Sequence, residues 1–122
     1  MDGLEYSGAL VAIAQRNFAL LGILRERLAV FCGDAGTYDL LDTYNYFYLS
    51  NPFYSPVMKK FIANLVASLA QHDRPVTIIY YVPACHEDII ESNRFKKTAE
   101  FPGYEDNKIY MVPRCSRWVA AI

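Results

Sequence analysis

Acidic and amide side chains follow three apolar segments of this sequence, each where the segment ends. Glu5 closes a short apolar start, Asp34 follows a continuous apolar run, and the triplet Asn51-Pro52-Phe53 follows an aromatic run. In open α/β sheets, ligands bind at the carboxyl ends of the strands. The sequence therefore predicts that these side chains meet in one ligand-binding crevice.

The two carboxylates of this set suit the hydroxyl and amino groups of a nucleoside. Glu5 can accept hydrogen bonds from both hydroxyls of a ribose, and Asp34 can accept one from an adenine amino group. Each residue also has a plainer interpretation. Glu5 fits a solvated loop carboxylate, and Gly33-Asp34-Ala35-Gly36 fits an ordinary glycine-aspartate turn.

The triplet Asn51-Pro52-Phe53 suits the reacting end of a site. Because proline fixes the backbone, the asparagine side chain and the neighbouring carbonyl can point at one spot. The aromatic ring can pack on a flat substrate or on a sulfonium methyl group. The alternative is an ordinary strand-to-helix turn, in which Ser55 caps the next helix and Pro56 lies in its first turn.

Strand and helix patterns alternate around these residues. A helix capped by Ser7 has apolar residues at three- and four-residue steps up to Leu21, and Val57 to Leu69 form the clearest helical stripe. A further helical turn is predicted near Ile89. Strands are predicted around Glu5 and at Leu28–Cys32, Tyr44–Leu49, Val76–Val82, Phe95–Phe101 and Lys108–Val112. This order predicts one α/β domain over residues 1–122, with a mostly parallel sheet and a C-terminal antiparallel β-hairpin.

Bulk composition narrows the classes of function. The 122 residues are 53% hydrophobic and 20% charged, as in a globular domain, and the net charge of −1 comes without a basic stripe. A nucleic-acid partner is therefore unsupported. The three cysteines fit neither a disulfide framework nor a zinc knuckle, which favours a reducing, cytoplasmic setting. No apolar run approaches the ~20 residues that would cross a membrane.

Several of these segments match a known family in order and spacing. Gly3-Leu4-Glu5-Tyr6-Ser7, followed by Ile13-Ala14-Gln15-Arg16-Asn17, resembles the second strand and next helix of class I, Rossmann-like S-adenosylmethionine-dependent methyltransferases. Gly33-Asp34-Ala35 resembles their adenine-contacting segment, and Ser50-Asn51-Pro52-Phe53 resembles their fourth motif. The resemblance runs from the family's second strand to its last strand. It is strongest to a bacterial group whose fourth motif reads Asn-Pro-Phe.

The resemblance implies transfer of a methyl group from S-adenosylmethionine to an acceptor that these residues do not identify. Glu5 would hold the ribose, with Tyr6 beside it, and Asp34 would hold the adenine amino group next to a backbone contact from Ala35. Asn51 would contact the cofactor and, with Pro52 and Phe53, form the catalytic end. No metal is implied. The motif has one proline where amine methyltransferases of nucleic acids have two, so a nucleic-acid base as acceptor is again unsupported.

One part of the family pattern lies outside these residues. The glycine loop that holds the cofactor precedes the second-strand acid by ~20 residues, and counting back from Glu5 leads beyond Met1. We therefore expect an N-terminally truncated domain with weak cofactor binding and little activity. The family's strand order, 3-2-1-4-5-7-6, then leaves open strand edges near Glu5 and at Tyr44–Leu49, which predicts a homo-oligomer. The alternative function is a non-catalytic dimerisation or interaction module.

Overall fold

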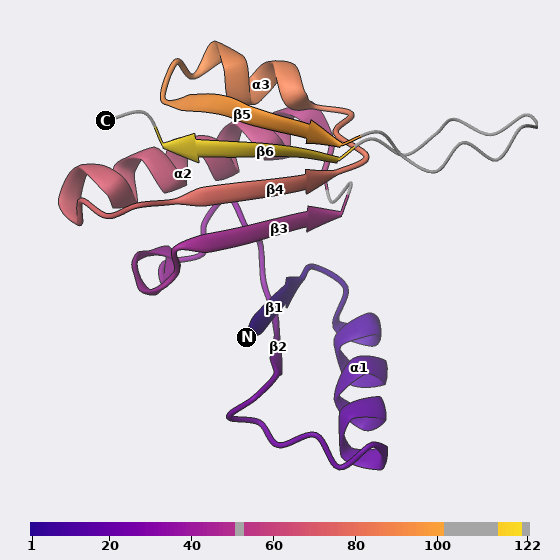
Figure 1. Ribbon diagram of the computed structural model, residues 1–122. Helices are drawn as coiled ribbons and strands as arrows, with labels where there is room; N and C mark the ends of the chain where they lie inside the picture. The colour runs from indigo at the N-terminus through magenta and orange to yellow at the C-terminus, as the bar shows by residue number, and fades with distance from the viewer. Residues whose placement is uncertain (51–52, 102–114, 121–122) are drawn as a thin grey trace, which may run out of the picture.

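In the computed structural model, the described residues form six strands and three α-helices, and the strands make up two separate sheets (Figure 1). The structure describes residues 1–50, 53–101 and 115–120. In chain order the elements are β1 (Asp2–Glu5), α1 (Gly8–Leu20), β2 (Ala29–Cys32), a 3₁₀ turn (Leu41–Thr43), β3 (Tyr46–Ser50), α2 (Ser55–Gln71), β4 (Thr77–Tyr81), α3 (His86–Glu91), β5 (Phe95–Phe101) and β6 (Cys115–Ala120). The mixed α/β class is as predicted.

The larger sheet has the strand order β3-β4-β6-β5. β3 and β4 are parallel, whereas β6 lies between β4 and β5 and runs antiparallel to both. Three strands of this sheet thus point one way and one points the other. The strand predicted at Lys108–Val112 lies outside the described residues. The strand that pairs with β5 is β6, further along the chain, which the sequence pattern did not reveal.

The smaller sheet consists of β1 and β2, paired in parallel from Asp2 opposite Ala29 to Glu5 opposite Cys32. Helix α1 packs against it and is capped as predicted, because the Ser7 hydroxyl accepts a hydrogen bond from the amide of Leu10. Among the described strands, β1 pairs only with β2, and β3 pairs only with β4. Within the described residues, each of these two strands thus has one edge without a strand partner.

Helix α2 covers the larger sheet with the face predicted for it (Figure 1). Met58, Phe61, Ile62 and Leu65 are all buried, at the spacing of a single helix face. The start of this helix corrects one prediction. The residue at the cap position is Tyr54, which makes no side-chain capping bond, and Ser55 is already helical.

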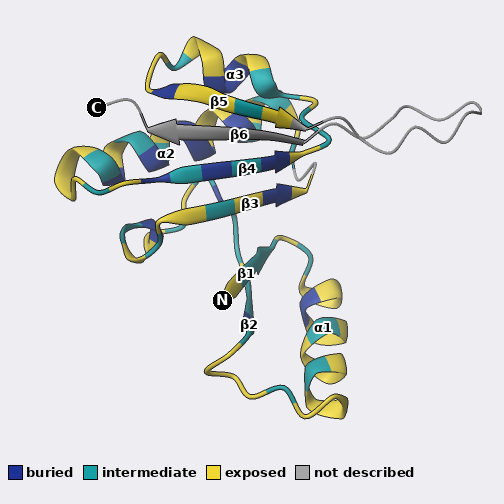
Figure 2. Cartoon of the chain, viewed as in Figure 1, coloured by how far each residue is buried: buried dark blue, intermediate teal, exposed yellow. Residues whose placement is uncertain are grey.

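The core lies between α2 and the larger sheet (Figure 2). β4 shows the alternation expected of a strand that is buried on one side, with Ile78 and Tyr80 fully buried. Ile89 of α3 and Phe95 of β5 close the same cluster. No helix among the described residues is long and apolar enough to span a membrane.

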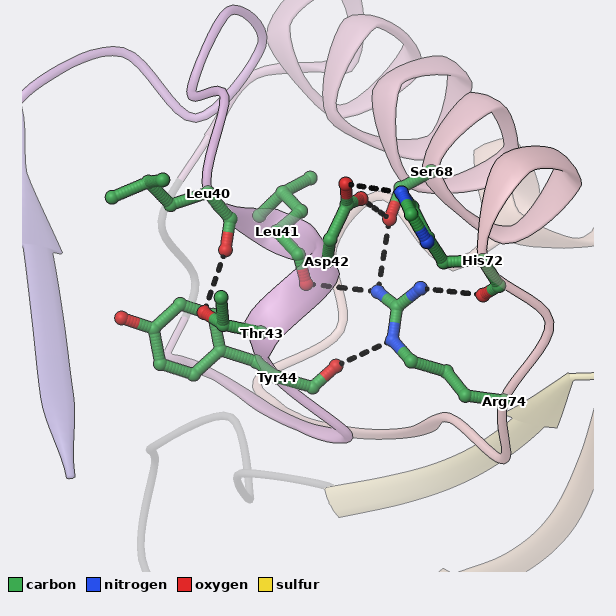
Figure 3. A network of polar contacts seen from close by, with 8 residues as sticks. All are labelled: Leu40, Leu41, Asp42, Thr43, Tyr44, Ser68, His72 and Arg74. Carbon is green, nitrogen blue, oxygen red and sulfur yellow. Dashed lines mark hydrogen bonds and ion pairs between the residues drawn. The ribbon is translucent and has the colours of Figure 1, made fainter.

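Arg74 fixes the chain just before β3 and β4 (Figure 3). Its guanidinium donates hydrogen bonds to the carbonyl oxygens of Leu41, Tyr44 and His72 at 2.8, 3.0 and 2.9 Å, and to the Ser68 hydroxyl at 2.9 Å. Two of these carbonyls belong to the turn that leads into β3, and one belongs to the end of α2. One side chain thus joins three segments and satisfies backbone acceptors that no ladder pairs.

Candidate functional site

A pocket of about 550 Å³ lies where β1, β2 and β3 end and α2 begins. It is within the size range of small-molecule sites. Its lining residues come from both sheets and from the turns that follow them: Leu4, Glu5, Tyr6, Gly33, Asp34, Ala35, Tyr48, Ser50, Phe53, Tyr54 and Val57. The predicted residues Glu5, Tyr6, Asp34, Ala35 and Phe53 therefore meet in one pocket. Asn51 and Pro52 lie outside the described residues.

Glu5 is held by the start of the following helix. Its Oε1 accepts a hydrogen bond from the backbone amide of Ser7 at 2.8 Å, which orients the carboxylate over the turn between β1 and α1. Among the described residues, Oε2 accepts no hydrogen bond. The Glu5 side chain thus supports the turn and also lines the pocket, and its contact with a ribose stays a prediction.

Asp34 forms the turn that its alternative interpretation predicted and still lines the pocket. Its Oδ1 accepts a hydrogen bond from the amide of Gly36 at 2.8 Å, as in an Asx turn. Gly36 is required here, because a Cβ at this position would lie 2.8 Å from the Cβ of Lys60 on α2. The turn therefore packs its backbone directly on the helix.

Polar contacts tie the smaller sheet to the rest of the protein. The side-chain amide of Asn64 on α2 donates to the carbonyl oxygens of Ala35 and Tyr38 at 3.3 and 2.9 Å. The Tyr44 hydroxyl donates to the Asp2 carboxylate at 2.6 Å, and this bond, aided by burial, raises the pKa of Tyr44 to about 12. These contacts join the smaller sheet and the turn after it to α2 and to the chain before β3.

The third predicted segment lines the opposite wall. Phe53 packs its ring on Phe61 of the core, with the ring centroids 5.8 Å apart, and also lines the pocket. Its backbone oxygen lies 3.5 Å from the thiol of Cys85, whose amide donates to the hydroxyl of Tyr80 at 3.1 Å. Burial raises the pKa of the Tyr80 phenol, which therefore stays protonated and neutral.

Sequence reasoning missed the aromatic wall formed by β3 and the turn after it. Tyr48 and Ser50 point into the pocket from β3, and Tyr54 and Val57 line it from the start of α2. The two-residue spacing of Tyr46, Tyr48 and Ser50 was an available signal, since these positions share one strand face. All three are exposed in the structure.

The charge of the pocket defines the ligands it suits. Glu5 and Asp34 are its two charged lining residues, and both are acidic. Tyr6, Tyr48 and Tyr54 add aromatic surface beside them. Carboxylates next to aromatic rings favour a ligand with hydroxyl or amino donors, a flat ring or a positive charge.

Comparison with known proteins places the fold. No protein-family profile matches the chain, and no curated protein is similar to it in sequence. The glycopeptide N-methyltransferase MtfA superposes on 98% of the chain in two crystal structures. Its complex with S-adenosyl-L-homocysteine gives a TM-score of 0.73 at 11% identity over 73% of that protein. Its complex with S-adenosyl-L-methionine gives 0.75 at 11% identity over 77%.

An uncharacterized protein from Listeria monocytogenes serotype 4b superposes with a TM-score of 0.70 at 18% identity, and the chain spans half of its length. Identities this low establish the fold and leave the activity open. Over 98% of its length the chain therefore shares the α/β fold of MtfA.

Proposed function

We propose that this chain is the cofactor-binding part of an S-adenosylmethionine-dependent methyltransferase. The observation that carries the proposal is the convergence of Glu5, Tyr6, Asp34, Ala35 and Phe53 on one pocket at the strand ends. These residues were selected from the sequence alone, and they come from three separate turns. The fold of MtfA, which is seen with both forms of the cofactor, supports the same assignment.

We assign to each residue the role that its sequence motif implies. Glu5 accepts hydrogen bonds from the ribose hydroxyls through Oε2, with Tyr6 beside it. Asp34 accepts one from the adenine amino group, and Ala35 adds a backbone contact. Phe53 lines the methyl-transfer end, and a role for Asn51 and Pro52 in methyl transfer rests on the sequence motif alone.

The bound cofactor would supply an electrophilic methyl group on a sulfonium sulfur. The protein's part is to place an acceptor in line with that carbon, which needs orientation more than an acid or a base. The carboxylates of Glu5 and Asp34 fix the nucleoside. The wall formed by Tyr48, Phe53 and Tyr54 packs against the nucleoside and limits how the acceptor approaches. A cytoplasmic setting stays a prediction.

Calorimetric titration of S-adenosylhomocysteine and of adenosine into the purified chain tests the proposal. The residues assigned above contact the nucleoside half, so we expect similar dissociation constants of about 0.1–1 mM for both ligands. Glu5→Gln and Asp34→Asn should each weaken binding about 5- to 10-fold, the loss expected for one charge-assisted hydrogen bond. Asp73→Asn changes an exposed acid at the end of α2 and serves as the control. Absence of saturable binding for both ligands contradicts the proposal.

A second candidate, an interaction module, is favoured by the open edges of β1 and β3. Unpaired strand edges recruit other chains, and a homo-oligomer would cover them. Light scattering during size-exclusion chromatography tests this function. A dimer or larger assembly without nucleoside binding favours the interaction module, and a monomer contradicts it.

A further inference from the structure

Asp88 is a buried carboxylate that lies outside the pocket. It belongs to α3, is 8% exposed, and its Oδ1 accepts a hydrogen bond from the Ser55 hydroxyl at 2.9 Å. The ammonium group of Lys59 lies 3.7 Å from the same oxygen. Oδ2 is buried and has no hydrogen-bond partner among the described residues. Burying a carboxylate with one oxygen lacking a hydrogen-bond partner costs stability. The placement of Asp88 beside Ser55 therefore calls for a physical explanation.

Cys85 makes a second contact with the same turn. Its thiol lies 3.5 Å from the carbonyl oxygen of Phe53, and its own amide is held by the hydroxyl of the fully buried Tyr80. A contact between S–H and oxygen is weak by itself. The charge-assisted hydrogen bond from Ser55 to Asp88 therefore contributes most of the energy that holds this turn. The weaker contact of the Cys85 thiol helps to orient the Phe53 carbonyl.

The segment that carries Cys85 and Asp88 is itself constrained. Val82, directly after β4, has a φ of 52°, a left-handed conformation that is unfavourable for a β-branched residue. Such strain persists only where the surrounding contacts over-determine it. The hydrogen bond between Tyr80 and Cys85 spans Val82, and the bond between Ser55 and Asp88 anchors the chain that follows it.

We propose that Asp88 and Cys85 are positioning residues for the pocket. They fix the turn after β3 at the Phe53 carbonyl and the Ser55 hydroxyl, on both sides of Tyr54, and so hold the aromatic wall from outside the pocket. Neither residue lines the pocket. The nature of the ligand in this inference rests on the proposed function, whereas the positioning of the turn does not.

The reactivity of Cys85 tests the positioning without any ligand. Alkylation by iodoacetamide is followed at Cys85 by peptide mass spectrometry in the native chain and in Ser55→Ala. Loss of the bond to Asp88 should loosen the turn and speed alkylation about 5- to 10-fold. Ser55→Thr, which keeps the hydroxyl, should return the rate to within about 2-fold of the native rate. The control Ser92→Ala removes a hydroxyl at the C-terminal end of α3, where it donates to the carbonyl of Ile89, and should leave the rate unchanged.

Should Ser55→Ala fail to fold, Asp88→Asn is the second variant, because it keeps the volume and weakens the bond by removing the charge. An unchanged alkylation rate at Cys85 in a folded Ser55→Ala or Asp88→Asn variant would overturn the proposal.

Nucleoside binding provides the readout that a purely structural role would not move. The dissociation constant for adenosine should rise about 5- to 10-fold in Ser55→Ala. In Ser92→Ala it should stay unchanged when the two variants are compared at an equal loss of unfolding free energy. An adenosine affinity that is equal in the two variants would argue against positioning. If the native chain binds no nucleoside, the proposed function fails, and the reactivity of Cys85 still decides whether the turn is positioned as described.

Discussion

The two sheets of this protein differ in how much apolar surface they bury (Figure 2). In α1, Val11 is buried, whereas Leu10 and Leu20 are 53% and 75% exposed. In α2, by contrast, a full helix face is buried against β3 and β4. Burial of apolar surface is the main favourable contribution to the free energy of folding. The smaller sheet and α1 are therefore expected to be the less stable part of the molecule.

The candidate site spans these two regions. Glu5 and Asp34 belong to the turns of the smaller sheet, and Phe53 and Tyr48 belong to the well-packed side. Between the sheets the described residues form no strand ladder, so polar contacts and local packing hold the two walls of the pocket together. The geometry of the pocket thus depends on the wall formed by the smaller sheet, which is expected to be the less stable one. The mutations below test this difference in stability.

The largest loss of stability is expected when a side chain is shortened in the core between α2 and the larger sheet. Leu65 of α2 is fully buried, and Leu65→Ala should lower the free energy of unfolding by about 3–4 kcal/mol. Val11→Ala in α1 removes fewer carbons from a less packed site and should cost about 1 kcal/mol. Urea unfolding followed by circular dichroism measures both. Equal losses would remove the contrast between the two regions.

Removal of the Arg74 side chain should rank second. Arg74→Ala leaves the carbonyl oxygens of Leu41, Tyr44 and His72 without this donor, and we expect a loss of about 2–3 kcal/mol. Arg74→Lys keeps the charge without the planar fork and should recover less than half of the loss. Full recovery by lysine would show that charge alone matters. The same urea titration provides the measurement.

Loss of the Asn64 amide should act on the junction between the two regions. Asn64→Ala removes the donor to the carbonyl oxygens of Ala35 and Tyr38, at an expected cost of about 1–2 kcal/mol. Hydrogen exchange should become faster in the turn at 33–38 and stay unchanged in β4. Asn45→Ala, at an exposed position before β3, is the control. Uniform faster exchange in both regions would contradict a local role.

The smallest effect is expected from the bond between Tyr44 and Asp2. The pKa of Tyr44 in the folded protein is about 12, above the ordinary value of 10, so the protonated phenol is favoured in the folded protein. The stabilisation is complete below pH 10 and is lost as the pH rises toward 12. Tyr44→Phe should cost under about 1 kcal/mol at pH 8, because the bond is partly exposed. Chemical unfolding at pH 8 and pH 11.5 should show a smaller difference between the variant and the native chain at the higher pH. A constant difference would exclude the linkage.

The sequence determined the order and type of the elements from β1 to β5. The apolar steps of α2, the Ser7 cap and the runs that became β2, β3 and β4 are local signals, since each depends on residues within one or two turns of the chain. The strand-end rule also selected Glu5, Asp34 and Phe53 for the pocket, because parallel strands end at one edge of a sheet.

Only the tertiary structure decided which groups pair across the chain. Ser55 fitted the pattern of a helix cap, yet its hydroxyl donates to Asp88, 33 residues away. β6 gave no strand signal, yet it lies between β4 and β5. The partners of such groups are far away in sequence, so no local pattern records them. Their positions follow from the packing of helices and strands against one another, which is why the supports of the pocket emerge only in the folded chain.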